Sequence, residues 1–385
     1  MDVLSVSVAD GGDHIDHWRD EIDRVDEQLV ALINRRAGYS LAIGRVKARS
    51  GAATFQPERE RQVVERLCSL NGGPLADGQV DAIWQAIMRA SRELQTHGKI
   101  AFLGPAGTYS EDAVRAYFGE AAVPCPGASI DEVFARFVGG EVEFAVVPIE
   151  NSTEGAVNRA VDLLLDTSAP IKGEVVIPVR HCLLSTGRSL SGVTRVFGHP
   201  QSLAQCRDWL ERMLPGATRQ EAPSNAEAAR LAAAAPDSAA IAGAHAAALY
   251  GLRVVAEDIQ DHADNCTRFL VLGNAPTAAT GFDRTTLAVY LDHHPGALAD
   301  LLAPFGRRGV SVLWVDARPR RTKPWRYRFL LDVAGHRDDP QLAAALDELG
   351  TVAESYRVLG SYPRFDSAFV TVDALRPATA AGDLS

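Results

Sequence analysis

Apolar side chains recur at helical spacing through the first hundred residues. From residue 18 to about 49 they fall every three or four positions, which predicts one long helix through Trp18, Ile22, Val25, Leu29, Leu32, Ile33 and Ile43. A shorter helix is expected to begin at Gln56 and Pro57 and to end at the Asn-Gly-Gly-Pro turn of residues 71–74. A third helix is expected from about residue 79 to 95. Residues 14–97 therefore predict an all-helical domain.

The pattern then changes to short β-rich runs that alternate with helical stretches. Strands are expected at residues 100–103, 144–149, 175–184, 193–197, 239–242 and 269–272, so residues 99–273 predict an α/β domain. After a linker of small residues at 274–284, the order is strand, helix, strand, strand, helix, strand, at residues 286–291, 296–305, 310–315, 327–333, 340–349 and 355–359. This order predicts a ferredoxin-like α+β domain at residues 285–362. Residues 1–13 and 363–385 are expected to be flexible tails.

Length and charge narrow the class of protein. The chain has 385 residues, enough for two or three domains, and its formal net charge of −10 argues against nucleic-acid binding, which needs a basic face. No apolar run approaches the roughly 18 residues of a membrane span, and the first residues do not resemble a signal peptide, so a cytoplasmic protein without a membrane partner is expected. Five scattered cysteines fit a reduced compartment without structural zinc. An anionic substrate must then be held by a few placed cations.

Two cations interrupt the apolar stripe of the long helix. Arg36 and Lys47 are separated by 11 positions, which puts them within about 20° of each other on the face that should be buried. Because an unpaired buried cation is unfavourable, either a salt-bridge network with Glu60 or an anionic ligand is expected there; stems that reach past the core to water are a third interpretation. The third helix likewise continues its apolar stripe with Ser91 and Gln95.

The length of the first helix predicts a second copy of the chain. Arg19 lies about 100° around the helix from Arg36, and a helix of roughly 30 residues extends about 45 Å, more than two shorter helices can cover. A helix-swapped homodimer or a higher homo-oligomer is expected, with Arg19 donated across the interface.

Residues 14–97 resemble the all-helical chorismate mutase domain, through W-R-D-E-I-D from Trp18, R-R ending at Arg36, Lys47, P-E-R-E from Pro57, and S-x-x-x-Q from Ser91. The resemblance implies a chorismate site in which Arg19 and Arg36 bind the carboxylates, aided by Arg59 and Ser91. It also implies that the catalytic pair Lys47 and Gln95 hydrogen-bonds the ether oxygen and that Glu60 hydrogen-bonds the ring hydroxyl. Gln56 stands where some members have an aspartate. A Claisen rearrangement needs a compact conformer and positive charge at the ether oxygen, which such a site supplies.

Polar clusters follow several predicted strands of the α/β region, where open sheets place their ligand sites. They are the Gly-Pro-Ala-Gly-Thr-Tyr-Ser segment at residues 104–110, Glu-Asn-Ser-Thr at 150–153, His-Pro-Gln at 199–201, and the Ser224–Glu227 capping box. Each cluster alone is also explained by loop and cap chemistry.

Taken together, these clusters and the Asn-Cys-Thr-Arg-Phe run at 265–269 resemble prephenate dehydratase, whose fold is two α/β lobes around a cleft. The resemblance places Thr267 and Arg268 in the cleft, with Phe269 packing beneath them. Loss of the prephenate hydroxyl needs a proton donor or relay, for which Thr267 is the candidate, although it could equally polarise a water. Arg268 is expected to anchor a carboxylate. The remaining candidate prephenate contacts are Thr108, Tyr109, Ser110, Glu150, Asn151, Ser152, His199, Gln201, Ser224 and Asn225.

Residues 285–362 resemble the ACT domain, which binds amino acids between subunits. Pro295 and the Gly-Ala-Leu run of Gly296, Ala297 and Leu298 match the family's turn at a helix start, where free N–H groups can take a carboxylate. Asp316, Ala317, Arg318 and Pro319 stand where many dehydratases have E-S-R-P. Feedback inhibition by phenylalanine at these two segments is expected; the alternative is a dimerising module that senses no ligand.

These resemblances predict an enzyme of phenylalanine biosynthesis that takes chorismate and prephenate as substrates and phenylalanine as effector. Neither step calls for a metal or organic cofactor. Two alternatives stay open: a dehydratase that prefers arogenate, and a non-catalytic sensor of aromatic metabolites.

Overall fold

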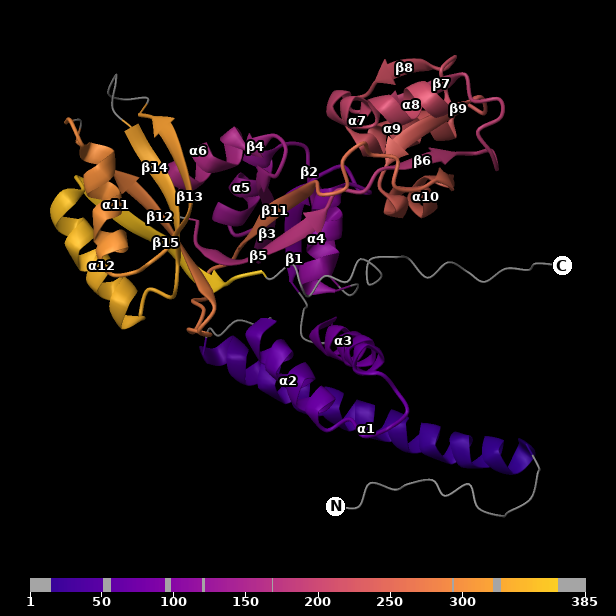
Figure 1. Cartoon of the computed structure of the whole chain (residues 1–385), viewed down its shortest axis with the longest axis horizontal. Coiled ribbons are helices and arrows are strands. Elements are labelled where there is room, and N and C mark those ends of the chain that lie inside the picture. The colour runs from indigo at the N-terminus through magenta and orange to yellow at the C-terminus, as the bar shows by residue number, and fades with distance from the viewer. Residues whose placement is uncertain are drawn as a thin grey trace.

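The computed structural model of the chain describes residues 15–50, 57–93, 98–119, 122–167, 169–292, 294–320 and 327–365 (Figure 1). The side chains of residues 45–50, 57–58, 89 and 92–93 lie outside this description. Residues 1–14 and 366–385 also lie outside it; of the C-terminal segment that the sequence predicts to be flexible, residues 363–365 are described, and Pro363 belongs to the last strand. None of the described helices is long and apolar enough to cross a membrane.

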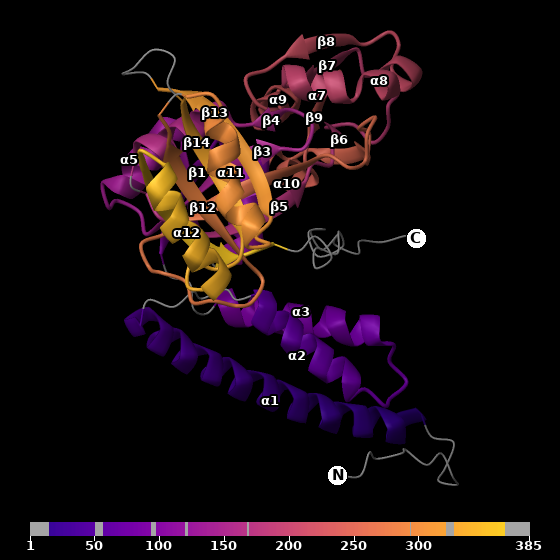
Figure 2. The same cartoon turned by 60° about the vertical axis from the view of Figure 1, so that its left-hand side comes forward.

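Three helices form the N-terminal part, as the apolar periodicity predicts. They are α1 (Ile15–Ser50), α2 (Pro57–Ser69) and α3 (Asp77–Glu93). At 36 residues, α1 spans about 54 Å and extends well past its two shorter neighbours (Figures 1 and 2). Much of its apolar stripe is uncovered within one chain: Leu29, Leu32 and Ile43 each expose 46% or more of their surface.

The first α/β lobe is built on a sheet in the order β2-β1-β3-β11-β5, with the short β4 beside β3. Its elements are β1 (Lys99–Leu103), α4 (Tyr109–Phe118), β2 (Val123–Gly127), α5 (Ile130–Val138), β3 (Phe144–Asn151), β4 (Gly155–Ala156), α6 (Asn158–Asp166), β5 (Ile171–Pro178) and β11 (Cys266–Leu272). Strands β1, β2 and β3 are parallel, whereas β11 runs antiparallel between β3 and β5. The chain therefore leaves this lobe after β5 and returns to its centre through β11.

The second lobe lies between those two crossings, on a sheet in the order β10-β6-β9-β7-β8. Its elements are β6 (Cys182–Ser185), β7 (Arg195–Gly198), α7 (Pro200–Gln205), α8 (Arg207–Met213), β8 (Thr218–Glu221), α9 (Asn225–Ala233), β9 (Ser238–Ala242), α10 (Ala244–Tyr250) and β10 (Arg253–Ala256). The single strand predicted at residues 175–184 is wrong. It is two strands of different sheets, β5 ending at Pro178 and β6 beginning at Cys182, and an apolar run cannot reveal that the sheets differ.

The C-terminal unit has the predicted ferredoxin-like order, on an antiparallel sheet β13-β14-β12-β15. Its elements are β12 (Asp283–Tyr290), α11 (Ala297–Arg307), β13 (Val312–Pro319), β14 (Tyr327–Ala334), α12 (Pro340–Val352) and β15 (Ser355–Pro363). Helices α11 and α12 cover one face of this sheet, and the first lobe lies against the other (Figures 1 and 2).

The first lobe and the ferredoxin-like unit share one core. Leu330 and Tyr362 of the unit pack in the same buried cluster as Val147 and Leu164 of the lobe. At Gly360 of β15, an added Cβ would lie 2.1 Å from the carbonyl oxygen of Ile171, so the backbones meet where only glycine fits. The two predicted domains are therefore packed as one body at this face.

Candidate active sites and regulatory pocket

The N-terminal helices bring two predicted mutase residues together. Nη1 of Arg36, on α1, donates a 2.9 Å hydrogen bond to Oγ of Ser91, on α3, although the two residues are far apart in the sequence. Ser91 is 6% exposed and donates in turn to the carbonyl of Ile87. A half-buried guanidinium is thus fixed at the contact between α1 and α3, as an anion site requires.

Arg19 does not reach this point within one chain. It lies 17 positions before Arg36, or about 25 Å along the helix, and pairs with Asp16 at 3.2 Å on an exposed surface. Arg59 is exposed and Glu60 half-buried on α2. The Lys47 side chain, Gln56 and Gln95 lie outside the described residues.

Thr267, at the start of β11, meets Asn151, at the end of β3. The backbone N–H groups of Thr153 and Glu154 donate to Oδ1 of Asn151 at 3.0 and 3.1 Å, which fixes the orientation of its amide. Nδ2 of Asn151 therefore donates to Oγ1 of Thr267, at 2.9 Å. Because Thr267 accepts this bond, its own proton stays available for another acceptor, as a proton donor requires.

A second group of predicted residues gathers in the second lobe at the helix starts of α7 and α9. The His199 N–H donates to Oδ1 of Asn225 at 3.2 Å, and the Gln201 N–H donates to Nδ1 of His199 at 3.4 Å. Ser224 caps α9 by accepting from the Glu227 N–H at 3.0 Å. Direct hydrogen bonds between this group and Thr267 or Asn151 are absent among the described residues.

The Gly-Pro-Ala-Gly-Thr-Tyr-Ser segment connects the lobes. The Tyr109 hydroxyl donates to the Arg180 carbonyl at 2.6 Å, and burial raises the pKa of that hydroxyl well above its ordinary value. Thr108 bonds the Leu103 carbonyl at 3.2 Å, and Ser110 is buried. The side chains in this segment are thus largely occupied by the fold.

Arg268 differs from the expectation of a carboxylate anchor. Successive strand residues point to opposite faces, so Thr267 and Arg268 diverge. Arg268 is 7% exposed, and its guanidinium lies 2.9 Å from Asp332, 3.3 Å from Glu174 and 3.2 Å from Glu150. Carboxylates of the protein itself therefore already neutralise the charge of Arg268.

Asp332 belongs to β14 of the ferredoxin-like unit, so the ion cluster crosses the domain contact. Arg284 of β12 adds a second cation, 2.8 Å from Asp332 and 3.2 Å from Glu174. Burial alone would raise the pKa of Asp332, but Arg268 and Arg284 hold it below its ordinary value.

Phe269 lies in the core of the first lobe, beside the strand residues Thr267 and Arg268. It is 2% exposed and packs in a buried cluster with Ile100 and Phe102. It supports β11 from within the core of the lobe.

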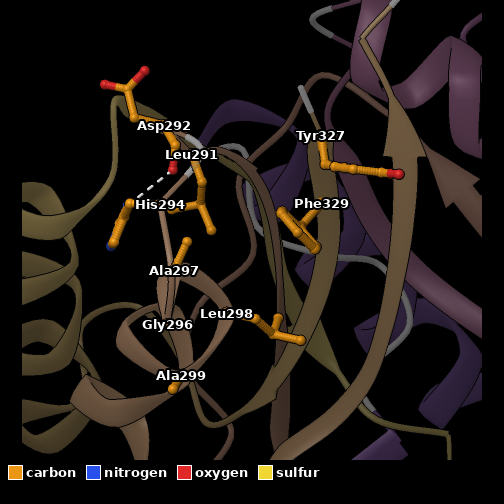
Figure 3. A pocket seen from close by; sticks show the side chains of 9 residues that line it. All are labelled: Leu291, Asp292, His294, Gly296, Ala297, Leu298, Ala299, Tyr327 and Phe329. Carbon is orange, nitrogen blue, oxygen red and sulfur yellow. Dashed lines mark hydrogen bonds between the residues drawn. The ribbon is translucent and has the colours of Figure 1, made fainter. Parts of the chain in front are cut away.

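The Gly-Ala-Leu run lines a pocket of about 320 Å³, at the lower end of the range for small-molecule sites (Figure 3). Leu291, Leu298 and Phe329 gather around it, and His294 and Tyr327 also line it. Gly296 has φ of 87°, a left-handed conformation that opens α11 and that other residues rarely adopt.

The charged residues of the Asp-Ala-Arg-Pro segment point to the opposite face of the same sheet, whereas Ala317 and Pro319 alternate with them and stand opposite Phe329 and Tyr327 of the pocket. Asp316 and Arg318 stand opposite Leu330 and Arg328 in the register, on the face towards the first lobe. The Arg318 guanidinium holds Asp162 of α6 at 3.1 and 3.2 Å. One buried carboxylate oxygen of Asp316 has no hydrogen-bond partner among the described residues. Within one chain, Asp316 and Arg318 are therefore on the far side of the sheet from the pocket, and only Pro319 of the predicted set stands beside it.

Sequence reasoning missed three polar residues between the lobes, namely His181, Gln205 and Asn265. Asn265 stands two positions before Thr267, and Gln205 lies one helical turn after Gln201, so spacing could have drawn attention to both. His181 follows an apolar run and carries no such signal.

Fold and sites together define a multidomain enzyme, with a helical unit, a two-lobed α/β unit and a ferredoxin-like module. Family models for chorismate mutase type II, prephenate dehydratase and the ACT domain match residues 18–96, 100–277 and 285–351. The bifunctional chorismate mutase/prephenate dehydratase of Neisseria gonorrhoeae is 43% identical over 350 residues, which cover 90% of this chain and 96% of that protein.

Two solved structures resemble about two thirds of the chain. Prephenate dehydratase from Arthrobacter aurescens, in complex with L-Phe, has a TM-score of 0.64 at 37% identity, covering 69% of this chain and 90% of its own. GqqA, a quorum-quenching acylase, has the same TM-score at 31% identity, covering 69% of this chain and 98% of its own.

The chain belongs to the family of bifunctional chorismate mutase/prephenate dehydratases. It is an enzyme with both activities, an isomerase and a lyase, in phenylalanine biosynthesis.

Proposed function

We propose that chorismate binds in the helical unit beside Arg36 and Ser91 and rearranges there to prephenate. The hydrogen bond between these two residues supports this assignment, because it holds a guanidinium at the contact of α1 with α3. Lys47 and Gln95 stabilise the charge that develops on the ether oxygen, while Gln56, Arg59 and Glu60 complete the site.

The site is completed by a second subunit. The exposed apolar stripe of α1 and the distance of Arg19 from Arg36 both support a homodimer in which the α1 helices are exchanged. Arg19 of each chain then reaches the site of the other.

Prephenate is dehydrated and decarboxylated to phenylpyruvate at Thr267. The bond from Asn151 carries this proposal, because it leaves the Thr267 proton free for the departing hydroxyl. Loss of that hydroxyl as water lets the ring become aromatic as carbon dioxide leaves. Glu150, Ser152, His199, Gln201, Ser224 and Asn225, with Thr108, Tyr109 and Ser110, shape the surroundings.

Phenylalanine inhibits the enzyme from the pocket at Gly296, Ala297 and Leu298. The apolar lining suits an aromatic side chain, and the start of α11 suits a carboxylate. Because Asp316 and Arg318 lie on the other face, they contribute through the subunit contact and the link to α6 rather than within the same pocket, whereas Pro319 stands opposite Tyr327 at the edge of the pocket.

The domain limits we propose are residues 14–97, 99–273 and 285–362, and the proposed location is the cytoplasm. The family-model matches and the acidic, cysteine-poor composition support these assignments.

Two single variants test the separation of the sites. Lys47→Ala should abolish mutase activity and leave the dehydratase intact, and Thr267→Ala should do the reverse. Purified enzyme is given chorismate, prephenate or arogenate, and products are followed over time. Loss of both activities in either folded variant contradicts the two-site proposal. Faster turnover of arogenate than of prephenate contradicts the assigned second substrate.

A further inference from the structure

A continuous chain of polar side chains runs from Thr267 across the connections between the lobes. From Thr267 it passes through Asn151 to Asn265, then to Gln205 in the second lobe, to His181 and to Tyr109. Asn265 ends the connection that returns to the first lobe, and His181 ends the connection that leaves it. The chain therefore joins both crossings to the proposed proton donor.

Hydrogen-bond directions along this chain follow from its first member. Because Nδ2 of Asn151 is fixed as a donor, Oδ1 of Asn265 must accept from it, at 2.9 Å. The same oxygen lies 3.0 Å from the Thr153 hydroxyl. Nδ2 of Asn265 must then face Gln205 and donates to its Oε1 at 3.2 Å.

The direction continues to the histidine. Oε1 of Gln205 accepts, so Nε2 of His181, 2.8 Å away, carries the proton of the ring. Nδ1 is then an acceptor 3.1 Å from the Tyr109 hydroxyl, whose single proton is shared between this nitrogen and the Arg180 carbonyl. His181 is 1% exposed, and burial lowers its pKa, which favours this neutral form. The arrangement leaves Nε2 of Gln205 buried without a partner among the described residues, so the fold tolerates an unpaired donor there.

We propose that Asn265, Gln205 and His181 are positioning residues of the dehydratase, which hold the Asn151 amide and through it the Thr267 hydroxyl in the orientation that the reaction needs. The inference rests on the proposed role of Thr267. None of the three residues has to touch the substrate. Their common task is to present one acceptor oxygen at Gln205 to two donors on different crossings.

The test compares Gln205→Met, which removes the acceptor, with Gln205→Glu, which keeps it. Gln205→Met should lower the dehydratase kcat about 10²-fold with KM for prephenate unchanged, since small displacements of a reacting group have effects of that size. Gln205→Glu should retain most of the activity. Gln220→Met, at an exposed glutamine on β8, is the matched control and should match the wild type. The chorismate mutase turnover of the same variants should not change.

Several outcomes overturn the proposal. An unchanged kcat in Gln205→Met does so, as does a raised KM at unchanged kcat, which indicates a substrate contact instead. Equal losses in the Met and Glu variants do so too, because the acceptor would then be irrelevant. If Gln205→Met fails to fold, Asn265→Asp replaces it. This variant loses the donor towards Gln205 and should also lower kcat without changing KM. A wild-type kcat in Asn265→Asp refutes the proposed chain of hydrogen bonds.

Two further measurements distinguish this inference from the proposal that Thr267 is the proton donor. With ¹⁵N-histidine labelling, the signal that disappears in His181→Gln should report a ring protonated at Nε2 at neutral pH; an Nδ1-protonated ring or an imidazolium overturns the assignment. Thr267→Val is assayed alongside. If Thr267→Val keeps the activity, the proposed donor is wrong; if it is inactive while Gln205→Met is normal, only the positioning chain is wrong.

Discussion

Replacement of Arg268 by methionine distinguishes a substrate anchor from a structural ion. Methionine keeps much of the stem's volume and removes the charge. Glu174 and Asp332, 3% and 1% exposed, would then share only Arg284. Breaking a buried ion pair from one side costs about 3–5 kcal/mol, and the remaining cation favours the lower end, about 3 kcal/mol.

The expected result is a lower melting temperature with a nearly normal KM. About 3 kcal/mol corresponds to a fall of about 6–12 °C for a domain of this size, measured by calorimetry. An anchor would behave differently: losing a charged hydrogen bond worth about 1.5–3 kcal/mol would raise KM for prephenate about 10- to 150-fold without destabilising the fold.

Two companion variants sharpen the comparison. Arg230→Met removes an arginine from an exposed pair with Glu227 and should leave the melting temperature unchanged. Adding Asp332→Asn to Arg268→Met removes a carboxylate that has lost its partner and should recover part of the loss. Wild-type stability with a strongly raised KM in Arg268→Met would refute the reasoning and restore the anchor.

Three further predictions address the ion cluster, the pocket and the dimer. The pKa of Asp332 is held below its ordinary value of about 4, so its contribution to stability is complete above that pH and is lost as the pH falls through the lowered pKa. Asp332→Asn should therefore reduce the loss of stability at acid pH, measured as the free energy of unfolding against pH. An unchanged acid dependence would contradict the ion pairing of Asp332. Leu298→Asp places a carboxylate where that of phenylalanine is proposed to bind and should raise the phenylalanine concentration for half-inhibition more than tenfold, with basal turnover unchanged; equal inhibition would exclude the pocket. Leu29→Asp on the exposed stripe of α1 should yield monomers in light scattering and lose mutase activity, and a stable active dimer would rule out the proposed interface.

Local patterns were sufficient for much of the fold. The period of apolar positions predicted α1 as one long helix and the ferredoxin-like order of the last unit, because both depend on neighbours a few residues apart. The position of residues 150–153 at the end of a predicted strand marked Asn151 as a candidate, and the resemblance to prephenate dehydratase marked Thr267; the structure brings the two side chains together.

The order of the three units and most of the residues that mark each site can be predicted from the sequence. The face of the sheet or helix on which each residue acts depends on long-range packing. Alternation along a strand says that Thr267 and Arg268 point apart, but the partner on each side comes from distant segments, Asn151 for one and Asp332 for the other. For the same reason the sequence did not predict the break after Pro178 or the hydrogen bonds of His181, because the sequence around a buried residue does not indicate which sheet or helix will pack against it.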